Sequence, residues 1–281
     1  MLRIGWFSTG RGEGSRGLLR FVYEKLADID ARIEFVFSNR APGEAEGSDE
    51  YFRLARQYGL PLIHHSSAAF RRRKGGRFAG HRAEYDSEVQ EMLAGRSPDV
   101  CVLAGYMLIA SGELCRAYPL LNLHPALPDG PIGTWQEVVW QLIQQRASRT
   151  GAMMHLATEV VDRGPVVSYV TVPLDTPELE PHWLALGGRD VARIKEEQGE
   201  SYELFRLIRA AQYSREPYLL LETLRALSRG DIALDAGKVR IAADEGTDPQ
   251  GFGGLCLDAS IEEAMRRDGT PIPPRQIRGR L

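Results

Sequence analysis

Short apolar runs alternate with helically spaced apolar positions through the first two thirds of the chain. Apolar runs indicate strands, and apolar positions three or four residues apart indicate helices. The runs predict strands at Leu2–Ser8, Ile33–Ser38, Leu60–His64, Val100–Ala104, Leu120–Leu123, Gly151–Thr158 and Val166–Val172. The helical spacing predicts helices at Leu18–Ala27, Asp49–Tyr58, Tyr85–Ala94 and Glu137–Arg146. This alternation predicts an α/β fold, an open, mostly parallel Rossmann-like sheet with flanking helices.

The later part of the chain has a different pattern. Ser201–Arg229 predicts a helix pair or one long helix, broken near Pro217, and the following segment DIALDAGKVRIA has the rhythm of a hairpin with Gly237 in its turn. We therefore expect one domain over residues 1–230 and a C-terminal extension over residues 231–281 packed on it.

Two charged segments interrupt the alternation. Phe70–Arg82 is basic and glycine-rich, and Pro177–Gly199 carries prolines followed by charges. We expect the first to be a solvated loop or insertion, with a patch that meets an anionic substrate or a polyglutamate tail as the alternative. We expect the second to be a surface excursion.

Composition narrows the class of protein. A hydrophobic fraction of 43% over 281 residues is enough for a buried core, and a formal charge of −3 gives no sign of a nucleic-acid partner. The three cysteines are widely spaced and do not suggest a disulfide scaffold. No window reaches the roughly 18 consecutive apolar residues of a membrane span. We expect a cytoplasmic protein without a membrane or nucleic-acid partner.

Asn122 and His124 lie at the end of the predicted strand in LLNLHPALPDG. Their spacing of two puts both side chains on one face of the strand, and Pro125 ends the ladder. Ligands of open α/β sheets bind at the carboxyl ends of strands. An amide donor can stabilise an oxyanion and an imidazole can transfer a proton, so the pair suits acyl-group chemistry. A strand-end histidine with only a structural role remains the alternative.

Asp162 precedes Arg-Gly-Pro in the segment ATEVVDRGPVV. A carboxylate there can orient His124 and stabilise its protonated form. A turn aspartate with no such role is the alternative.

The turn after the first strand contains Gly12, Gly14 and Gly17 in the pattern G-x-G-x-x-G. A glycine turn between a strand and a helix suits a phosphate at the helix N-terminus. It also raises an alternative class, an NADP-dependent oxidoreductase. The second strand ends without an acidic residue for a ribose, so Arg40 would have to bind a 2′-phosphate.

Together these segments resemble the folate-dependent formyltransferases, and within them the enzymes that act on glycinamide ribonucleotide in purine synthesis. The resemblance rests on FSNRA, PDVCVLAGYMLI, NLHPALP and HLATEVVDRGPVV, in that order. It implies a formyltransferase fold and transfer of a formyl group from 10-formyltetrahydrofolate, as co-substrate, to a primary amine. It implies small-molecule partners and no metal, and it is compatible with a homodimer.

The resemblance also implies residue roles. Asn122, His124 and Asp162 match the catalytic set, and Gly14, Ser15 and Arg16 match the loop that binds the substrate phosphate through backbone N–H groups. The pterin-binding positions of the family match Met107, Leu108, Ile109, Ala157, Thr158, Glu159, Val160 and Val161.

Departures from the family pattern concern the acceptor. The phosphate loop has Arg16 for asparagine, and a late Glu-His pair matches Gln212 and Tyr213. A stretch that contains Trp135 replaces a histidine-containing one. We expect Trp135, Gln212 and Tyr213 to line the acceptor pocket, and another amine, such as an amino sugar nucleotide, is the alternative acceptor.

Other outcomes remain open at this point. A formyltetrahydrofolate hydrolase and a binding protein without activity would keep the same residues. A methionyl-tRNA formyltransferase is disfavoured by the lack of a clear basic C-terminal RNA domain.

Overall fold

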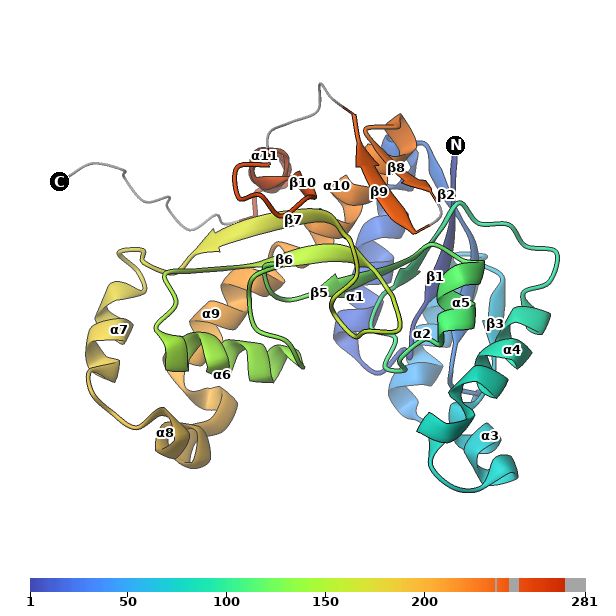
Figure 1. Cartoon of the computed structure of the whole chain (residues 1–281), viewed down its shortest axis with the longest axis horizontal. Helices are drawn as coiled ribbons and strands as arrows, with labels where there is room; N and C mark the ends of the chain where they lie inside the picture. The colour runs from blue at the N-terminus through green and yellow to red at the C-terminus, as the bar shows by residue number, and fades with distance from the viewer. Residues whose placement is uncertain (236, 243–247, 271–281) are drawn as a thin grey trace. The chain divides into compact units, whose positions relative to one another are not determined.

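The protein is described from a computed structural model that covers residues 1–235, 237–242 and 248–270 (Figure 1). The chain divides into two compact units, each assembled from separate segments. Among the described residues, unit 1 holds 1–123, 155–165 and 223–242, and unit 2 holds 124–154, 166–222 and 248–270.

Unit 1 contains a parallel sheet. Its strands lie in the order β5-β4-β1-β2-β3, and each neighbouring pair is parallel. The strands are β1 (Leu2–Phe7), β2 (Ala31–Ser38), β3 (Leu62–His64), β4 (Val100–Leu103) and β5 (Leu120–His124), the last residue of which belongs to unit 2. All four residues of β4 are buried, as an uninterrupted apolar run predicts. The predicted parallel sheet is confirmed.

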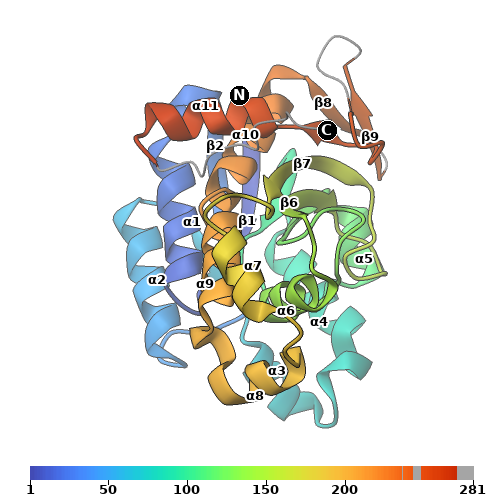
Figure 2. The ribbon, with the colours of Figure 1, turned by 90° about the vertical axis from the view of Figure 1, so that its left-hand side faces the viewer.

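Helices flank this sheet. They are α1 (Glu13–Glu24), η1 (Leu26–Ile29), α2 (Glu46–Gln57), α3 (Ser67–Lys74), η2 (Phe78–His81), α4 (Arg82–Met92) and α5 (Gly112–Ala117). Helices α1 and α2 lie side by side in both views (Figures 1 and 2). One core cluster between strands and helices is rich in aromatic side chains and includes Phe7, Phe35, Phe37 and Tyr85. The predicted hairpin is confirmed as the antiparallel pair β8 (Ile232–Asp235) and β9 (Lys238–Ile241).

Unit 2 combines three strands with a helical layer. The strand order is β10-β7-β6, from β6 (Arg149–Leu156, the last two residues of which belong to unit 1), β7 (Val166–Pro173) and β10 (Leu255–Cys256). The helices are α6 (Trp135–Gln145), α7 (Glu180–Leu186), α8 (Val191–Gln198), η3 (Gly199–Ser201), α9 (Glu203–Tyr213), α10 (Glu216–Arg229, which continues into unit 1) and α11 (Asp258–Arg267). Thr134 and Glu137 form a capping box that starts α6.

The two charged segments are largely helical, so the loop predicted over Phe70–Arg82 is wrong, whereas the surface excursion predicted over Pro177–Gly199 contains α7 and α8. Phe70 in α3 is 1% exposed and anchors that helix, while Arg71 to Lys74 point to solvent. Leu186 of α7 and Ile194 of α8 are buried in the core of unit 2 together with Phe205 of α9. The charged residues of these segments outnumber the few apolar residues on the buried face of each helix, so the helical pattern was not evident. A few buried side chains are enough to pack a short helix against the core.

The helix pair is confirmed, because α9 ends at Tyr213 and Pro217 is the second residue of α10. Proline is tolerated there, since the first turn of a helix needs no N–H partner. The predicted extension over residues 231–281 lies partly outside the described residues. Its described part supplies β8 and β9 to unit 1 and β10 and α11 to unit 2.

Candidate active site

Asn122 lies in β5 and its side-chain amide has two acceptors within unit 1. Nδ2 lies 3.1 Å from Nε2 of His155 and 3.3 Å from Oδ1 of Asp162. An amide nitrogen carries two hydrogens, so it can serve both acceptors at once. The structure therefore brings Asn122 and Asp162 together, as a shared site requires.

His155 is a neighbour of Asn122 that the sequence motifs do not single out. It is 2% exposed, and its Nδ1 donates to the carbonyl of Leu156 at 3.0 Å. Its Nε2 accepts from Asn122 and lies 3.6 Å from Oδ1 of Asp162. This is the hydrogen-bond pattern of a neutral ring. Its signal in the sequence was its place in the strand that leads to Asp162.

The local backbone explains how Asp162 is held. Asp162 has φ of +54°, a left-handed conformation that aspartate tolerates better than most side chains. Two residues later, Gly164 passes so close to the carbonyl of Leu156 that an added Cβ would come within 1.7 Å of its oxygen. The Asp-Arg-Gly-Pro turn thus needs a glycine for the approach, and it returns the carboxylate to β5.

His124 closes β5 and is 3% exposed. Its Nε2 lies 3.0 Å from the carbonyl oxygen of Pro131. A carbonyl can only accept, so Nε2 carries the hydrogen of this contact. The pairing of His124 with Asp162 stays a prediction.

The first turn of α1 contains Gly14, Ser15 and Arg16, so the helix begins earlier than the apolar spacing indicated. Gly12 caps the helix without a side-chain hydrogen bond, and Arg16 N–H donates to the Gly12 carbonyl at 3.3 Å. The backbone N–H groups of the helical residues before Arg16 have no intrahelical acceptor and can bind an anion. The side chain of Arg16 is held by Glu13 at 2.9 Å and Glu50 at 2.5 Å.

A cavity of about 500 Å³ opens within unit 1. Its lining combines the end of β6 with α5 and the β8–β9 hairpin: Ala157, Thr158 and Glu159 face Cys115 and Arg116, and Leu234 contributes from β8. A volume of this size suits a small organic ligand. Burial raises the pKa of the Cys115 thiol to about 11, with the carboxylates of Asp86 and Glu159 acting in the same direction.

The other residues predicted to hold a pterin, which are Met107, Leu108, Ile109, Val160 and Val161, lie outside the lining of this cavity. Leu108 and Ala157 pack on one core cluster with Cys115. Met107, Ile109, Val160 and Val161 are exposed by 58%, 42%, 62% and 45%. Glu159 pairs with Arg116 at 3.2 Å, and its carboxylate lies over Gly112, where an added Cβ would clash.

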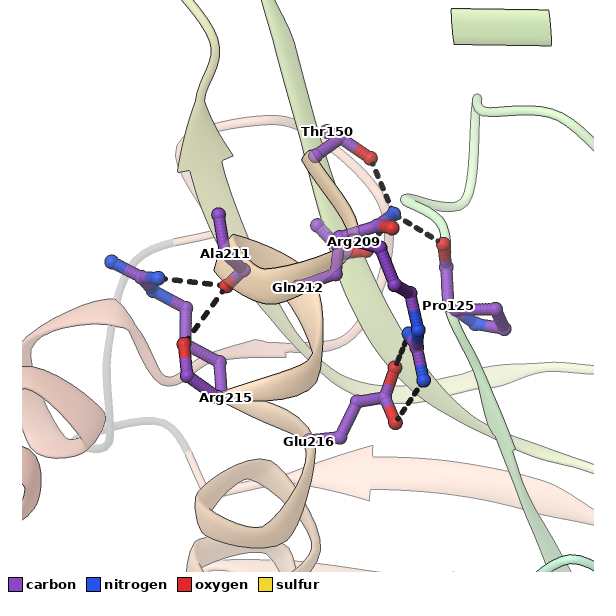
Figure 3. Close-up of polar contacts among 9 residues, drawn as sticks. Pro125, Thr150, Arg209, Ala211, Gln212, Arg215 and Glu216 are labelled. Carbon is purple, nitrogen blue, oxygen red and sulfur yellow. Dashed lines mark hydrogen bonds and ion pairs between the residues drawn. The ribbon is translucent and has the colours of Figure 1, made fainter. Parts of the chain in front are cut away.

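Trp135 and Tyr213, two residues predicted for the acceptor pocket, lie against the same cation in unit 2. The Arg209 guanidinium carbon is 4.9 Å from the ring centres of both Trp135 and Tyr213. Arg209 also makes a two-pronged ion pair with Glu216 (Figure 3). Tyr213 is 42% exposed, and Arg209 balances a carboxylate that is nearly buried.

Gln212 does not fit the role of a pocket residue. Its side chain is 0% exposed, and its Nε2 is taken by the Pro125 carbonyl at 2.7 Å and by Thr150 Oγ1 at 2.9 Å (Figure 3). Arg209, one helical turn earlier, was not singled out from the sequence. The sequence signal for Arg209 was its position three residues before Gln212 on a predicted helix, because residues three apart lie on the same helix face.

Within the described ranges, no cluster of three or more His, Cys, Asp or Glu side chains could hold a metal ion. The described helices also include none whose length and apolar character would let it cross a bilayer.

Comparisons with known proteins show the family of the chain. The family described as formyl transferase matches residues 18–182, which is more than half of the chain. The phosphoribosylglycinamide formyltransferase of Schizosaccharomyces pombe is 28% identical over 180 residues, covering 61% of this chain and 83% of that protein. The enzyme of the same name from Saccharomyces cerevisiae is 32% identical over 173 residues, covering 58% and 79%.

Solved structures extend the likeness. Glycinamide ribonucleotide transformylase 1 from Symbiobacterium toebii superimposes with a TM-score of 0.58 at 26% identity, covering 86% of this chain and 94% of that one. Phosphoribosylglycinamide formyltransferase from Coxiella burnetii superimposes with a TM-score of 0.63 over 91% and 98%, and at 18% identity it supports the fold alone. The chain therefore belongs to the formyl transferase family and is a formyltransferase.

Proposed function

We propose that this formyltransferase moves the formyl group of 10-formyltetrahydrofolate to the amine of glycinamide ribonucleotide. The observation that carries the proposal is the Asn122 amide, which lies between Asp162 and His155 at the end of a parallel strand. The relatives named phosphoribosylglycinamide formyltransferase suggest the acceptor. Family membership argues against the NADP-dependent oxidoreductase.

Asn122 would stabilise the negative oxygen that forms when the amine attacks the formyl carbon. Its bond to Asp162, at 3.3 Å, is longer than the usual 2.9–3.0 Å of such bonds. A developing oxyanion can therefore replace that acceptor with a shorter, stronger contact. The second bond to His155 would keep the amide nitrogen facing the substrate.

His124 and Asp162 would manage the protons. The attacking amine must lose a proton, and the nitrogen of the leaving tetrahydrofolate must gain one. His124, whose Nε2–H is held by the Pro131 carbonyl, would accept and return that proton. Asp162 would favour the protonated ring by its charge.

The donor and the acceptor would use different features of unit 1. We assign the pterin to the cavity lined by Ala157, Thr158 and Glu159, because its volume suits a small organic ligand and these three residues match pterin-binding positions of the family. We assign the acceptor phosphate to the first turn of α1, where Gly14 and Ser15 have N–H groups without intrahelical acceptors. Arg16 would move from Glu13 towards a bound phosphate.

The test is a formyl-transfer assay with purified protein, followed by the absorbance change as 10-formyltetrahydrofolate is consumed. We expect product with glycinamide ribonucleotide, formed about 10²–10³ times more slowly by the Asn122→Ala variant. If the donor is consumed with an amino sugar nucleotide and not with glycinamide ribonucleotide, the acceptor is the amino sugar nucleotide. Donor loss without any amine would indicate a hydrolase. No donor consumption with any acceptor would reject the proposal.

A further inference from the structure

Gln212, in the last turn of α9, is a fully buried amide with three acceptors around one nitrogen. Nε2 lies 2.7 Å from the Pro125 carbonyl, 2.9 Å from Thr150 Oγ1 and 3.5 Å from the Gly151 carbonyl. Figure 3 shows this nitrogen between α9, β6 and the chain after β5. The two amide hydrogens suit the two shorter contacts.

The other end of the same amide has no comparable contact. Oε1 of Gln212 is buried and has no hydrogen-bond partner among the described residues. An apolar side chain of similar length would avoid that cost, so the site uses the glutamine for its donors. The structural question is what those donors hold in place.

The donors of the Gln212 amide hold the beginning of the segment 125–131, here named the His124 loop. Proline has no N–H, so the carbonyl of Pro125 is its only backbone group for hydrogen bonding, and Gln212 uses it. A turn inside the loop is closed by Gly130 N–H donating to the Leu127 carbonyl at 2.8 Å. The far end of the loop presents the Pro131 carbonyl to Nε2 of His124 at 3.0 Å.

The loop therefore begins directly after His124 in the chain, and the carbonyl of its last residue contacts the His124 ring. Its position decides whether the hydrogen of the neutral imidazole stays on Nε2. Pro125 and Pro131 also have φ angles fixed by their rings, which limits how the loop can adjust if its anchor is removed. The anchor at the Pro125 end is the Gln212 amide.

We propose that Gln212 is a positioning residue for His124: it fixes the His124 loop so that the Pro131 carbonyl keeps the hydrogen of the ring on Nε2. The consequence for catalysis rests on the proposed function, whereas the consequence for the tautomer does not. A simpler role, in which Gln212 only ties α9 to β6, would leave the His124 ring unaffected.

The test compares Gln212→Met, which keeps length and removes both donors, with Ile208→Val. Ile208 lies one turn earlier on α9, is 0% exposed and packs in the core of unit 2, so it controls for loss of packing. Gln212→Asn, whose amide is too short to reach Pro125, serves as a second variant. Thermal unfolding sets the temperature at which all variants are folded.

The tautomer is measured by nitrogen NMR of protein labelled in its six histidines, with the His124 signals assigned from a His124→Gln sample. We expect Nε2–H in the wild type and in Ile208→Val, and a mixture of tautomers in Gln212→Met and Gln212→Asn. We expect kcat to fall about 10- to 100-fold in these two variants, with KM for both substrates within about 3-fold, since part of a general acid–base contribution is lost.

An unchanged His124 tautomer in both Gln212 variants would overturn the proposal, even if stability fell. A lower kcat that Ile208→Val reproduces would also overturn it. If the wild type transfers no formyl group but its tautomer depends on Gln212, the positioning role stands and the proposed function fails.

Discussion

Asn122 and Asp162 are 40 residues apart in the chain, yet the amide nitrogen of Asn122 lies 3.3 Å from a carboxylate oxygen of Asp162. The same nitrogen is 3.1 Å from His155. One amide thus connects the end of a parallel strand to the turn that follows β6. The first predictions concern these two side chains.

Replacing Asn122 by Ala should lower kcat by about 10²–10³, as expected for the loss of one oxyanion donor. Substrate KM values should change little, because the oxyanion forms only during the reaction. Asn122→Asp should be at least as damaging, since it sets a second carboxylate beside Asp162. Steady-state rates of formyl transfer measure both effects. An Asn122→Ala enzyme within a few-fold of the wild type would contradict the role.

Asp162→Gly should separate activity from stability. The left-handed backbone at φ of +54° costs a non-glycine residue about 1 kcal/mol, and glycine adopts it freely. We therefore expect a thermal midpoint equal to or above that of the wild type, together with a loss of activity. Asp162→Ala should lose activity and stability together. Calorimetry and rate assays on both variants decide this, and an active Asp162→Gly enzyme would show that the carboxylate is dispensable.

Leu234→Trp should weaken donor binding, because Leu234 lines the cavity of about 500 Å³ from β8. Ala233→Trp, on the neighbouring exposed position of the same strand, is the matched control. We expect the Kd of a non-reactive folate analogue to rise about tenfold in the first variant, since added volume displaces part of the ligand. Titration calorimetry measures it. Equal affinities in both variants would mean that the donor does not use this cavity.

Cys115 should react slowly with thiol reagents in the folded protein. Its pKa of about 11 lies two units above the ordinary value of 9.0, so the thiolate fraction at pH 8 is about 100-fold lower. Mass spectrometry after timed alkylation can follow Cys115 separately from the other two cysteines. Protein unfolded in denaturant is the control, and a folate analogue should slow labelling further. Equal rates in folded and unfolded protein would contradict the expected protection.

The sequence was most informative where apolar residues were continuous. The strand at Val100 was predictable because every residue of β4 is buried. The helices at Phe70 and Leu186 were missed because charged neighbours dominate those segments and only isolated apolar residues face the core. Helices α5 and α11 were also missed, since short elements leave too few repeats for a period to appear.

The candidate site was predictable only as separate motifs. Asn122 and Asp162 each carried a signal, but their contact depends on a turn in which Gly164 approaches the Leu156 carbonyl, a tertiary feature with no periodic signature. His155 carried no motif of its own. Gln212 aligned with a family position near the acceptor, and only its burial reveals that its amide is used inside the protein.

Both compact units are assembled from three separate stretches of the chain, and this limits how the protein can be dissected. A truncation after residue 230 would remove β8 and β9 from the first unit and α11 from the second. No contiguous fragment contains either unit alone. Expression of either unit by itself would therefore require its three separate segments to be rejoined.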